Sequence, residues 1–219
     1  MKTKLISIAF TLFLFSIFAN AQISVGVLGG VNFQNLNGKS SSGDVLENTM
    51  IPGFHAGLNL QIPVAPEFYF EPGLLFTTKG AKNPGSILTA TTSLSYIEMP
   101  LNFLYKGSLG SGFVLVAVGP YVGYALKGNV KYEGGAVTVD SPVKFQNVVE
   151  LTDSPLVPYY RALDAGANIS FGYEMKSGIF AKVNAQLGMI NINPEYKLLS
   201  DDKSAVKNTG FGVSLGYQF

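Results

Sequence analysis

The sequence has no cysteine, no tryptophan and a single histidine, His55, in 219 residues. Without cysteine there is no disulfide framework, no cysteine-based metal site and no cysteine for lipid attachment. One histidine is also too few for a histidine-based zinc cluster. The sequence therefore predicts no cofactor, no metal site and a fold held together by packing and hydrogen bonds.

Charge is scarce as well. Charged residues make up 13% of the chain, against about 25% in an average soluble domain. The net charge of +1 gives no support for a nucleic-acid partner, and none is predicted. Hydrophobic residues reach 47%, yet beyond the first residues no run approaches the ~20 apolar residues of a membrane helix. This combination is typical of a transmembrane β-barrel, whose apolar positions alternate with others.

The N-terminus has the pattern of a secretory signal peptide. Lys2 and Lys4 precede an apolar core over residues 5–18, and Ala19-Asn20-Ala21 matches a cleavage site. A retained membrane anchor is the alternative, but the core is short for one. We therefore predict a signal peptide over residues 1–21, cleaved after Ala21, and a β-barrel domain over residues 22–219.

The last eleven residues show the clearest strand pattern. Large apolar residues occupy every second position, namely Phe211, Val213, Leu215, Tyr217 and Phe219. Glycine or neutral polar residues lie between them. Strict alternation indicates a strand with two unlike faces, and about ten residues suffice for a tilted strand to cross a membrane. The absence of charge on both faces favours lipid on one side.

Seven further segments alternate in a similar way. The eight predicted strands cover residues 23–34, 53–62, 67–78, 93–106, 113–127, 161–174, 179–190 and 209–219. Long polar connections at 35–50, 79–92, 128–160 and 191–208 alternate with short turns, and residues 136–139 could add a strand outside the membrane. The sequence thus predicts an all-β fold, an eight-stranded antiparallel up-and-down transmembrane β-barrel with short periplasmic turns and long extracellular loops.

Charges within the predicted strands fall on the glycine-bearing face, which would line the lumen. The predicted lumen set is Glu67, Glu71, Glu98, Lys106, Asp164, Glu174 and Lys182, with His55, Asn59, Asn102, Asn168, Asn184 and Gln186. A soluble lipocalin-like carrier would instead need a charged outer face. Eight strands leave a lumen that side chains can fill, so we predict a structural network that plugs a non-conducting barrel. An ion or proton path is the alternative.

Two positions in this set carry sharper expectations. Pairing across the turn at 176–178 would place Lys182 beside Gly172 and diagonal to Glu174, so that the two charges could meet. Met99-Pro100 suggests a bulge that would orient the Glu98 carboxylate.

At these motifs the chain resembles the PorT-like family of bacterial outer-membrane β-barrels. The resemblance rests on the export signal, on SYIEMPLNFLYK within 93–106, on VGPYVGYALKG, on Leu163-Asp164-Ala165-Gly166 and on the terminal GVSLGYQF. It implies an integral protein of the outer membrane of a Gram-negative bacterium. It also implies that the barrel assembly machinery reads the closing strand with Tyr217 and Phe219. Some members of the family are linked to secretion or surface functions, and no active-site residue is carried over.

Two functional hypotheses follow. In the first, the barrel is a structural or partner-binding surface protein anchored among outer-membrane lipids, whose loops at 35–50, 128–159 and 191–208 bind envelope or secretion proteins. In the second, it is an enzyme acting on lipid through a Ser–His pair that includes His55. The sequence places no serine beside His55, so we predict that the protein is not an enzyme.

Overall fold

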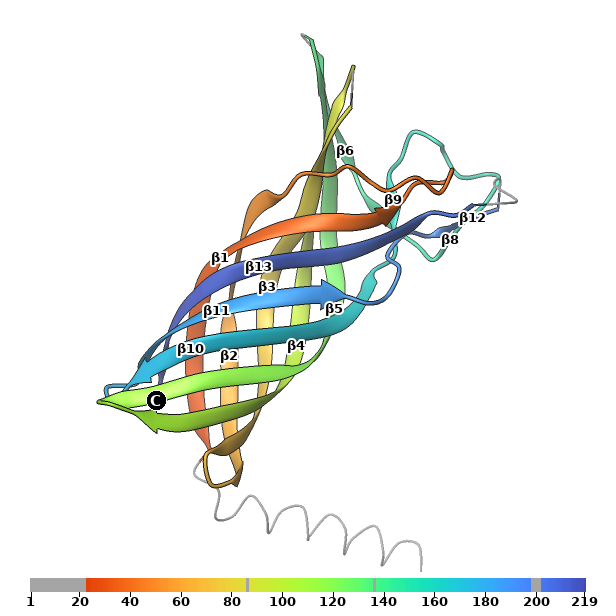
Figure 1. Ribbon diagram of the computed structural model, residues 1–219. Coiled ribbons are helices and arrows are strands. Elements are labelled where there is room, and N and C mark those ends of the chain that lie inside the picture. The colour runs from red at the N-terminus through yellow and green to blue at the C-terminus, as the bar shows by residue number, and fades with distance from the viewer. Residues whose placement is uncertain (1–22, 86, 136, 198–201) are drawn as a thin grey trace, which may run out of the picture.

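The computed structural model describes residues 23–85, 87–135, 137–197 and 202–219. The predicted signal peptide lies outside these residues. Eight strands form a closed antiparallel ring, in which β10 pairs with β5 and β13 pairs with β1 (Figure 1). They are β1 (Ser24–Lys39), β2 (Ile51–Ala65), β3 (Phe68–Pro84), β4 (Thr89–Leu109), β5 (Gly112–Gly134), β10 (Leu163–Met175), β11 (Ile179–Gly188) and β13 (Ala205–Gln218). The predicted eight-stranded up-and-down barrel is confirmed.

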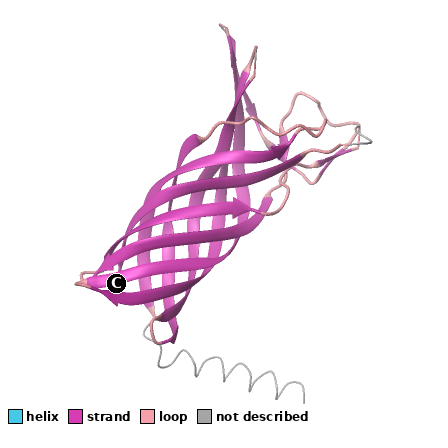
Figure 2. Cartoon of the chain, viewed as in Figure 1, coloured by secondary structure: helices cyan, strands magenta, loops and turns pink. Residues whose placement is uncertain are grey.

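The short and long connections lie at opposite ends of the barrel. Tight turns at residues 66–67, 110–111 and 176–178 share one end with the start of β1 and the end of β13, where Gly26 pairs with Gln218. We call this the turn end. The opposite, loop end carries the long connections (Figures 1 and 2). No helix among the described residues is long and apolar enough to cross a membrane.

Short strands organise the loop end. The strand expected near residues 136–139 is present as β6 (Val137–Pro142), which pairs with β5 above the ring. Two parallel pairs hold the longer connections: β7 (Lys144–Phe145) with β9 (Tyr159–Tyr160), and β8 (Val148–Val149) with β12 (Glu195–Tyr196). The loops are therefore tied to one another by backbone hydrogen bonds.

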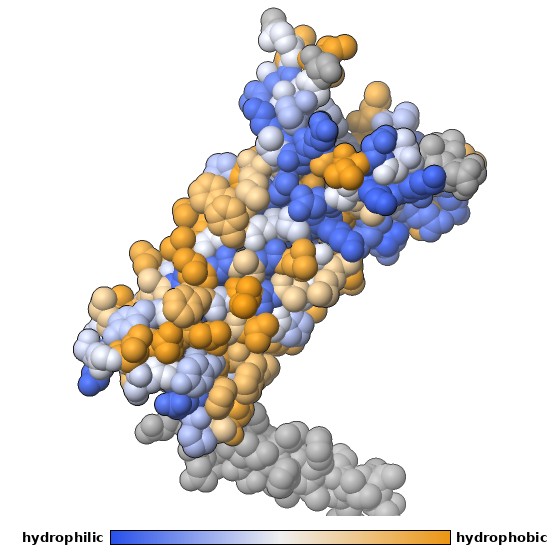
Figure 3. All heavy atoms as spheres, in the orientation of Figure 1, coloured by the Kyte–Doolittle hydropathy of each residue, from blue (hydrophilic) through white to orange (hydrophobic). Residues whose placement is uncertain are grey.

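An apolar band surrounds the barrel, and we use this name for the outward large apolar side chains of the eight strands. Leu215 and Val213 are 64% and 45% exposed, whereas Ser214 between them is 3% exposed and faces inward. The band shows as orange and tan spheres in Figure 3, and the loop end is mostly blue. The alternation predicted from sequence therefore separates a lipid-like outer surface from a polar interior.

The strands β3, β4 and β5 continue well beyond the apolar band, which corrects the loop predicted at 79–92. Lys79 pairs with Leu94, Lys82 with Thr91, and Thr91 with Lys131. Outward positions in this extension are polar, so the segment lacks the apolar alternation used to find strands. These strands form the tall ribbon that rises at the loop end in Figure 1.

Candidate functional site: the barrel interior

The interior of the barrel contains most of the charged residues predicted for it. The structure places Glu71, Glu98, Asp164, Glu174, Lys106 and Lys182 inside. Glu67 is the exception and corrects the prediction. Its backbone has φ of 64°, and it lies exposed in the tight turn between β2 and β3. The turn interrupts the alternation one residue before β3 begins, so Glu67 does not share the inward face of Glu71.

A fully buried lysine, Lys79, forms the centre of the network. Its Nζ lies 2.6 Å from Glu98 Oε2 and 3.0 Å from Asp164 Oδ2, with 0% of the side chain exposed. The amine also lies 4.3 Å from the centroid of the Tyr121 ring, a favourable cation–π distance. Asn208 donates to Asp164 Oδ2 at 2.9 Å. One lysine therefore connects two carboxylates from different strands.

Sequence reasoning missed Lys79 and Asn208 because it assigned both to loops. A signal was present, since Thr77, Lys79 and Ala81 continue the inward alternation of β3 and are all buried. The charge of Lys79 concealed it, because a lysine after an apolar strand reads as the start of a loop.

A second ion pair crosses the barrel. Lys182 on β11 contacts Glu71 on β3, with 2.9 Å from Nζ to Oε2. In the ring, β3 and β11 are four strands apart in either direction, so they lie on opposite walls. Asn59 also donates to Glu71 Oε2 at 3.0 Å. The carboxylate is thus held from its own side and from the far wall.

The expected meeting of Lys182 and Glu174 does not occur. Lys182 does pair with Gly172 in the ladder, as predicted, and a methyl group on Gly172 would lie 2.8 Å from Lys182 Cγ. Glycine therefore makes room for the lysine chain, which extends across the lumen instead of along the wall. Glu174 instead binds Lys106 of β4 at 2.7 Å.

The bulge expected at Met99-Pro100 is also absent. The β4–β5 register is the same on both sides of Pro100, and the irregularity lies between Ser95 and Tyr96. Glu98 is oriented by its contacts: besides Lys79, Gln186 donates to its Oε1 at 2.7 Å.

The histidine lies beside a serine that the sequence did not point to. His55 Nε2 is 2.7 Å from Ser214 Oγ, and Asn184 donates to the same oxygen at 2.9 Å. These residues border a cavity of ≈ 110 Å³ that Glu98 and Lys182 also line. Both His55 and Ser214 are buried and face the interior.

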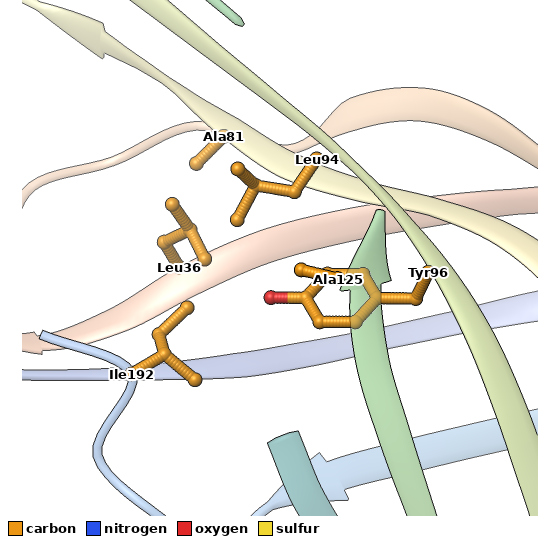
Figure 4. Packing of buried hydrophobic residues seen from close by; sticks show 6 residues of the cluster. All are labelled: Leu36, Ala81, Leu94, Tyr96, Ala125 and Ile192. Carbon is orange, nitrogen blue, oxygen red and sulfur yellow. The ribbon is translucent and has the colours of Figure 1, made fainter. Parts of the chain in front are cut away.

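Apolar side chains occupy both halves of the interior. Toward the loop end, one buried cluster contains Leu36, Ala81, Leu94, Tyr96, Ala125 and Ile192 (Figure 4). Its members come from β1, β3, β4, β5 and the connection after β11, so they reach in from facing walls. A second cluster consists of Leu104, Leu115, Ala117 and Phe180. Charged residues of the interior lie beside these clusters: in the ladder Lys79 pairs with Leu94, and Lys106 pairs with Leu115 toward the turn end.

The chemistry of the interior is that of ion pairs and amide hydrogen bonds. No group of three or more His, Cys, Asp or Glu side chains able to hold a metal ion occurs in the described part of the chain. The two residues predicted as an assembly signal, Tyr217 and Phe219, lie outside the lumen and face outward at the turn end. Their rings pack edge to face, with 4.9 Å between the ring centroids.

Comparisons with known proteins give a family. Residues 18–193, more than half of the chain, match the family described as outer membrane protein beta-barrel domain. No curated protein matches.

Solved structures give only weak similarities. Ail, the attachment invasion locus protein of Yersinia pestis, has 9% identity and a TM-score of 0.40 over 90% of this chain and 98% of its own. OccK1 of Pseudomonas aeruginosa has 8% identity and a TM-score of 0.13 over 90% and 99%. These scores are too low to inform function, and the family match does not depend on them. The chain belongs to the outer membrane protein beta-barrel domain family.

Proposed function

We propose that the protein is a sealed, non-conducting outer-membrane barrel that anchors a partner-binding surface at its loop end. The observation that carries this proposal is the Lys182–Glu71 ion pair across the interior. Buried charges are stable only when they are paired and hydrogen-bonded. An open aqueous channel would hydrate these groups and remove the need for contacts from facing walls.

The loop end has the features expected of a binding surface. Its connections are held by the β7–β9 and β8–β12 pairs, yet they expose Leu151 at 66% and Leu156 at 85%. Exposed apolar side chains on ordered loops suit contact with another protein. In this proposal the loop end is extracellular, and the chain is a PorT-like member of its family whose partner is an envelope or secretion protein.

Loop replacement tests the proposal. Residues 150–157 would be exchanged for a Gly/Ser linker, and crosslinked partners would be identified in native envelopes for both proteins. The proposal expects a specific crosslinked protein that disappears with the loop while the barrel remains inserted. An unchanged crosslinking pattern after replacement of this loop and of residues 40–50 would contradict it.

The contact between His55 and Ser214 calls for a test of the enzymatic alternative. The pair resembles the nucleophile and base of a hydrolase, but it faces the interior, and a cavity of ≈ 110 Å³ is small beside the ~300–1,000 Å³ of ordinary ligand sites. We propose a structural role. Loss of a lipid hydrolase activity in both His55→Ala and Ser214→Ala, with the barrel folded, would favour the enzyme instead.

A further inference from the structure

The outer face of β3, β4 and β5 changes character just beyond the apolar band. Cross-strand pairing arranges the outward residues there in three rows, which we call the hydroxyl–lysine face: Thr78, Ser95 and Lys127; Gly80, Ser93 and Asn129; Lys82, Thr91 and Lys131. Inward neighbours such as Lys79, Leu94 and Val130 are buried, which fixes the outward direction of the rows.

A β-bulge sets the position of Lys127. Ser95 pairs with Lys127 while Tyr96 pairs with Ala125, so Leu126 is an extra residue in β5. As a result Leu126 and Lys127 are both exposed, one after the other. Bulges commonly redirect a side chain in this way. Lys127 is thereby exposed next to Leu126, a member of the apolar band.

Two of the three lysines on this face carry a positive charge that no neighbouring carboxylate balances among the residues that the structure describes. Within the described residues, the ion pairs leave Lys82 and Lys127 without a carboxylate, whereas Lys131 contacts Glu133 at 2.8 Å. The opposite side of the barrel differs. There the polar rows above the band pair Asn35 with Thr209, Asn37 with Lys207 and Lys39 with Ala205. They supply two lysines but a single hydroxyl, against the four hydroxyls of the hydroxyl–lysine face.

We propose that the hydroxyl–lysine face binds the phosphorylated sugar headgroup of a membrane glycolipid whose acyl chains lie against the apolar band. Lys82 and Lys127 would hold phosphate oxygens, and the hydroxyls of Ser93, Ser95 and Thr91 would bind the sugar. The hydroxyl–lysine face is continuous with the apolar band. The headgroup and the acyl chains of one lipid molecule can therefore contact the two surfaces at the same time. A free phosphate would gain nothing from the band.

The distance between Lys82 and Lys127 limits which kinds of headgroup could contact both. They lie two strands and four residues apart, which corresponds to roughly 17 Å between their Cα atoms at ~4.8 Å per strand and ~3.4 Å per residue. That separation exceeds the reach of one phosphate. It suits a disaccharide with two phosphate groups.

Native mass spectrometry of the detergent-solubilised barrel tests the assignment. The probe is an acylated glucosamine disaccharide with two phosphates, and the comparison is the same lipid after phosphatase treatment. At ~1 kcal/mol per lysine near a lipid surface, Lys82→Gln/Lys127→Gln should weaken binding at least about tenfold. The control Lys39→Gln/Lys207→Gln removes equal charge from the opposite side of the barrel and should change affinity by less than about threefold.

Four results would overturn the proposal: equal weakening in the two double variants, no weakening in either, equal binding of the dephosphorylated lipid, or displacement by millimolar inorganic phosphate. Heat-modifiable gel mobility verifies that each variant is folded, so that loss of the barrel is not mistaken for loss of the site.

Discussion

Lys182 on β11 and Glu71 on β3 join opposite walls of the barrel through an ion pair of 2.9 Å. The lysine emerges beside Gly172, where the missing side chain leaves room for its aliphatic stem. Its charge then ends within the interior, where Asn59 and Gln61 also donate to the same carboxylate. This contact links opposite walls of the barrel through its centre, so the side chains fill the interior at this level and do not merely line it.

The first prediction concerns this brace. Lys182→Met should destabilise the folded barrel by about 3–5 kcal/mol, because it leaves the Glu71 carboxylate buried without its cation. Glu71→Gln added to Lys182→Met should recover most of the loss, since the neutral amide that replaces the carboxylate would keep an acceptor for Asn59 and Gln61. Urea titration followed by heat-modifiable mobility measures both. A double variant no more stable than the single one would contradict the pairing.

The second prediction follows from the balance of charge inside. Lys79 is shared by Glu98 and Asp164, whereas Glu174 is the carboxylate partner of Lys106. Glu98→Gln should therefore cost less than about 1 kcal/mol, because Lys79 keeps Asp164. Glu174→Gln should cost about 3 kcal/mol, because it leaves Lys106 without a carboxylate. The same urea titration compares them, and equal costs would show that the shared lysine needs both acids.

The third prediction tests the apolar band on the closing strand. Val213 and Thr209 lie on the same outward face of β13, but only Val213 lies within the band. Val213→Lys should cost ~2–4 kcal/mol, and Thr209→Lys ~0–1 kcal/mol, because the cost of a charge falls with distance from the bilayer midplane. Folding into lipid vesicles under a urea gradient gives both values. Equal costs would mean that the edge of the band is misplaced.

The fourth prediction concerns pH and the loop end. The backbone N–H of Glu150 and then the side-chain amide of Gln146 donate to Asp153, and these bonds lower the pKa of its carboxyl below the ordinary value. A lowered folded pKa stabilises this loop above the ordinary pKa of an aspartate, ~4. The contribution is lost as the pH falls below that value.

Hydrogen exchange measures the loop effect. The protection factor of the Glu150 amide should fall between about pH 5 and about pH 2 in the unmodified protein, because the lowered pKa of Asp153 puts its protonation below the ordinary value of ~4. In Asp153→Asn, whose acceptor does not titrate, the protection factor should stay constant over this range. Identical pH profiles for the two proteins would show that Asp153 does not control the loop.

The sequence predicted the number, order and faces of the eight ring strands because lipid and lumen impose opposite demands on alternate residues. The closing strand shows this best: Val213 and Leu215 are exposed outward, and Ser214 is buried. The prediction stopped at the edge of the apolar band. Beyond it, the outward residues of β3 and β4 are polar, and a strand with a polar outer face looks like a loop.

The partners inside the barrel could not be predicted in the same way. Local pairing gave Lys182 beside Gly172, but contacts across the lumen join residues far apart in the chain, such as Lys79 with Asp164. How far a long side chain reaches across the lumen depends on which residues of the facing strands are small. Which strands face each other is known only once the ring is closed. Glu67 was misplaced because one tight turn ended the alternation a residue early.

Planar-bilayer recording of the purified barrel tests the central claim most directly, namely that the ion pairs and the two apolar clusters together seal the interior. The account predicts no stable single-channel steps in symmetric salt at moderate voltage, both for the unmodified protein and for the loop-replacement variant. Stable, reproducible steps from the unmodified protein would contradict it, because they would require a continuous water-filled path past Lys79 and Lys182.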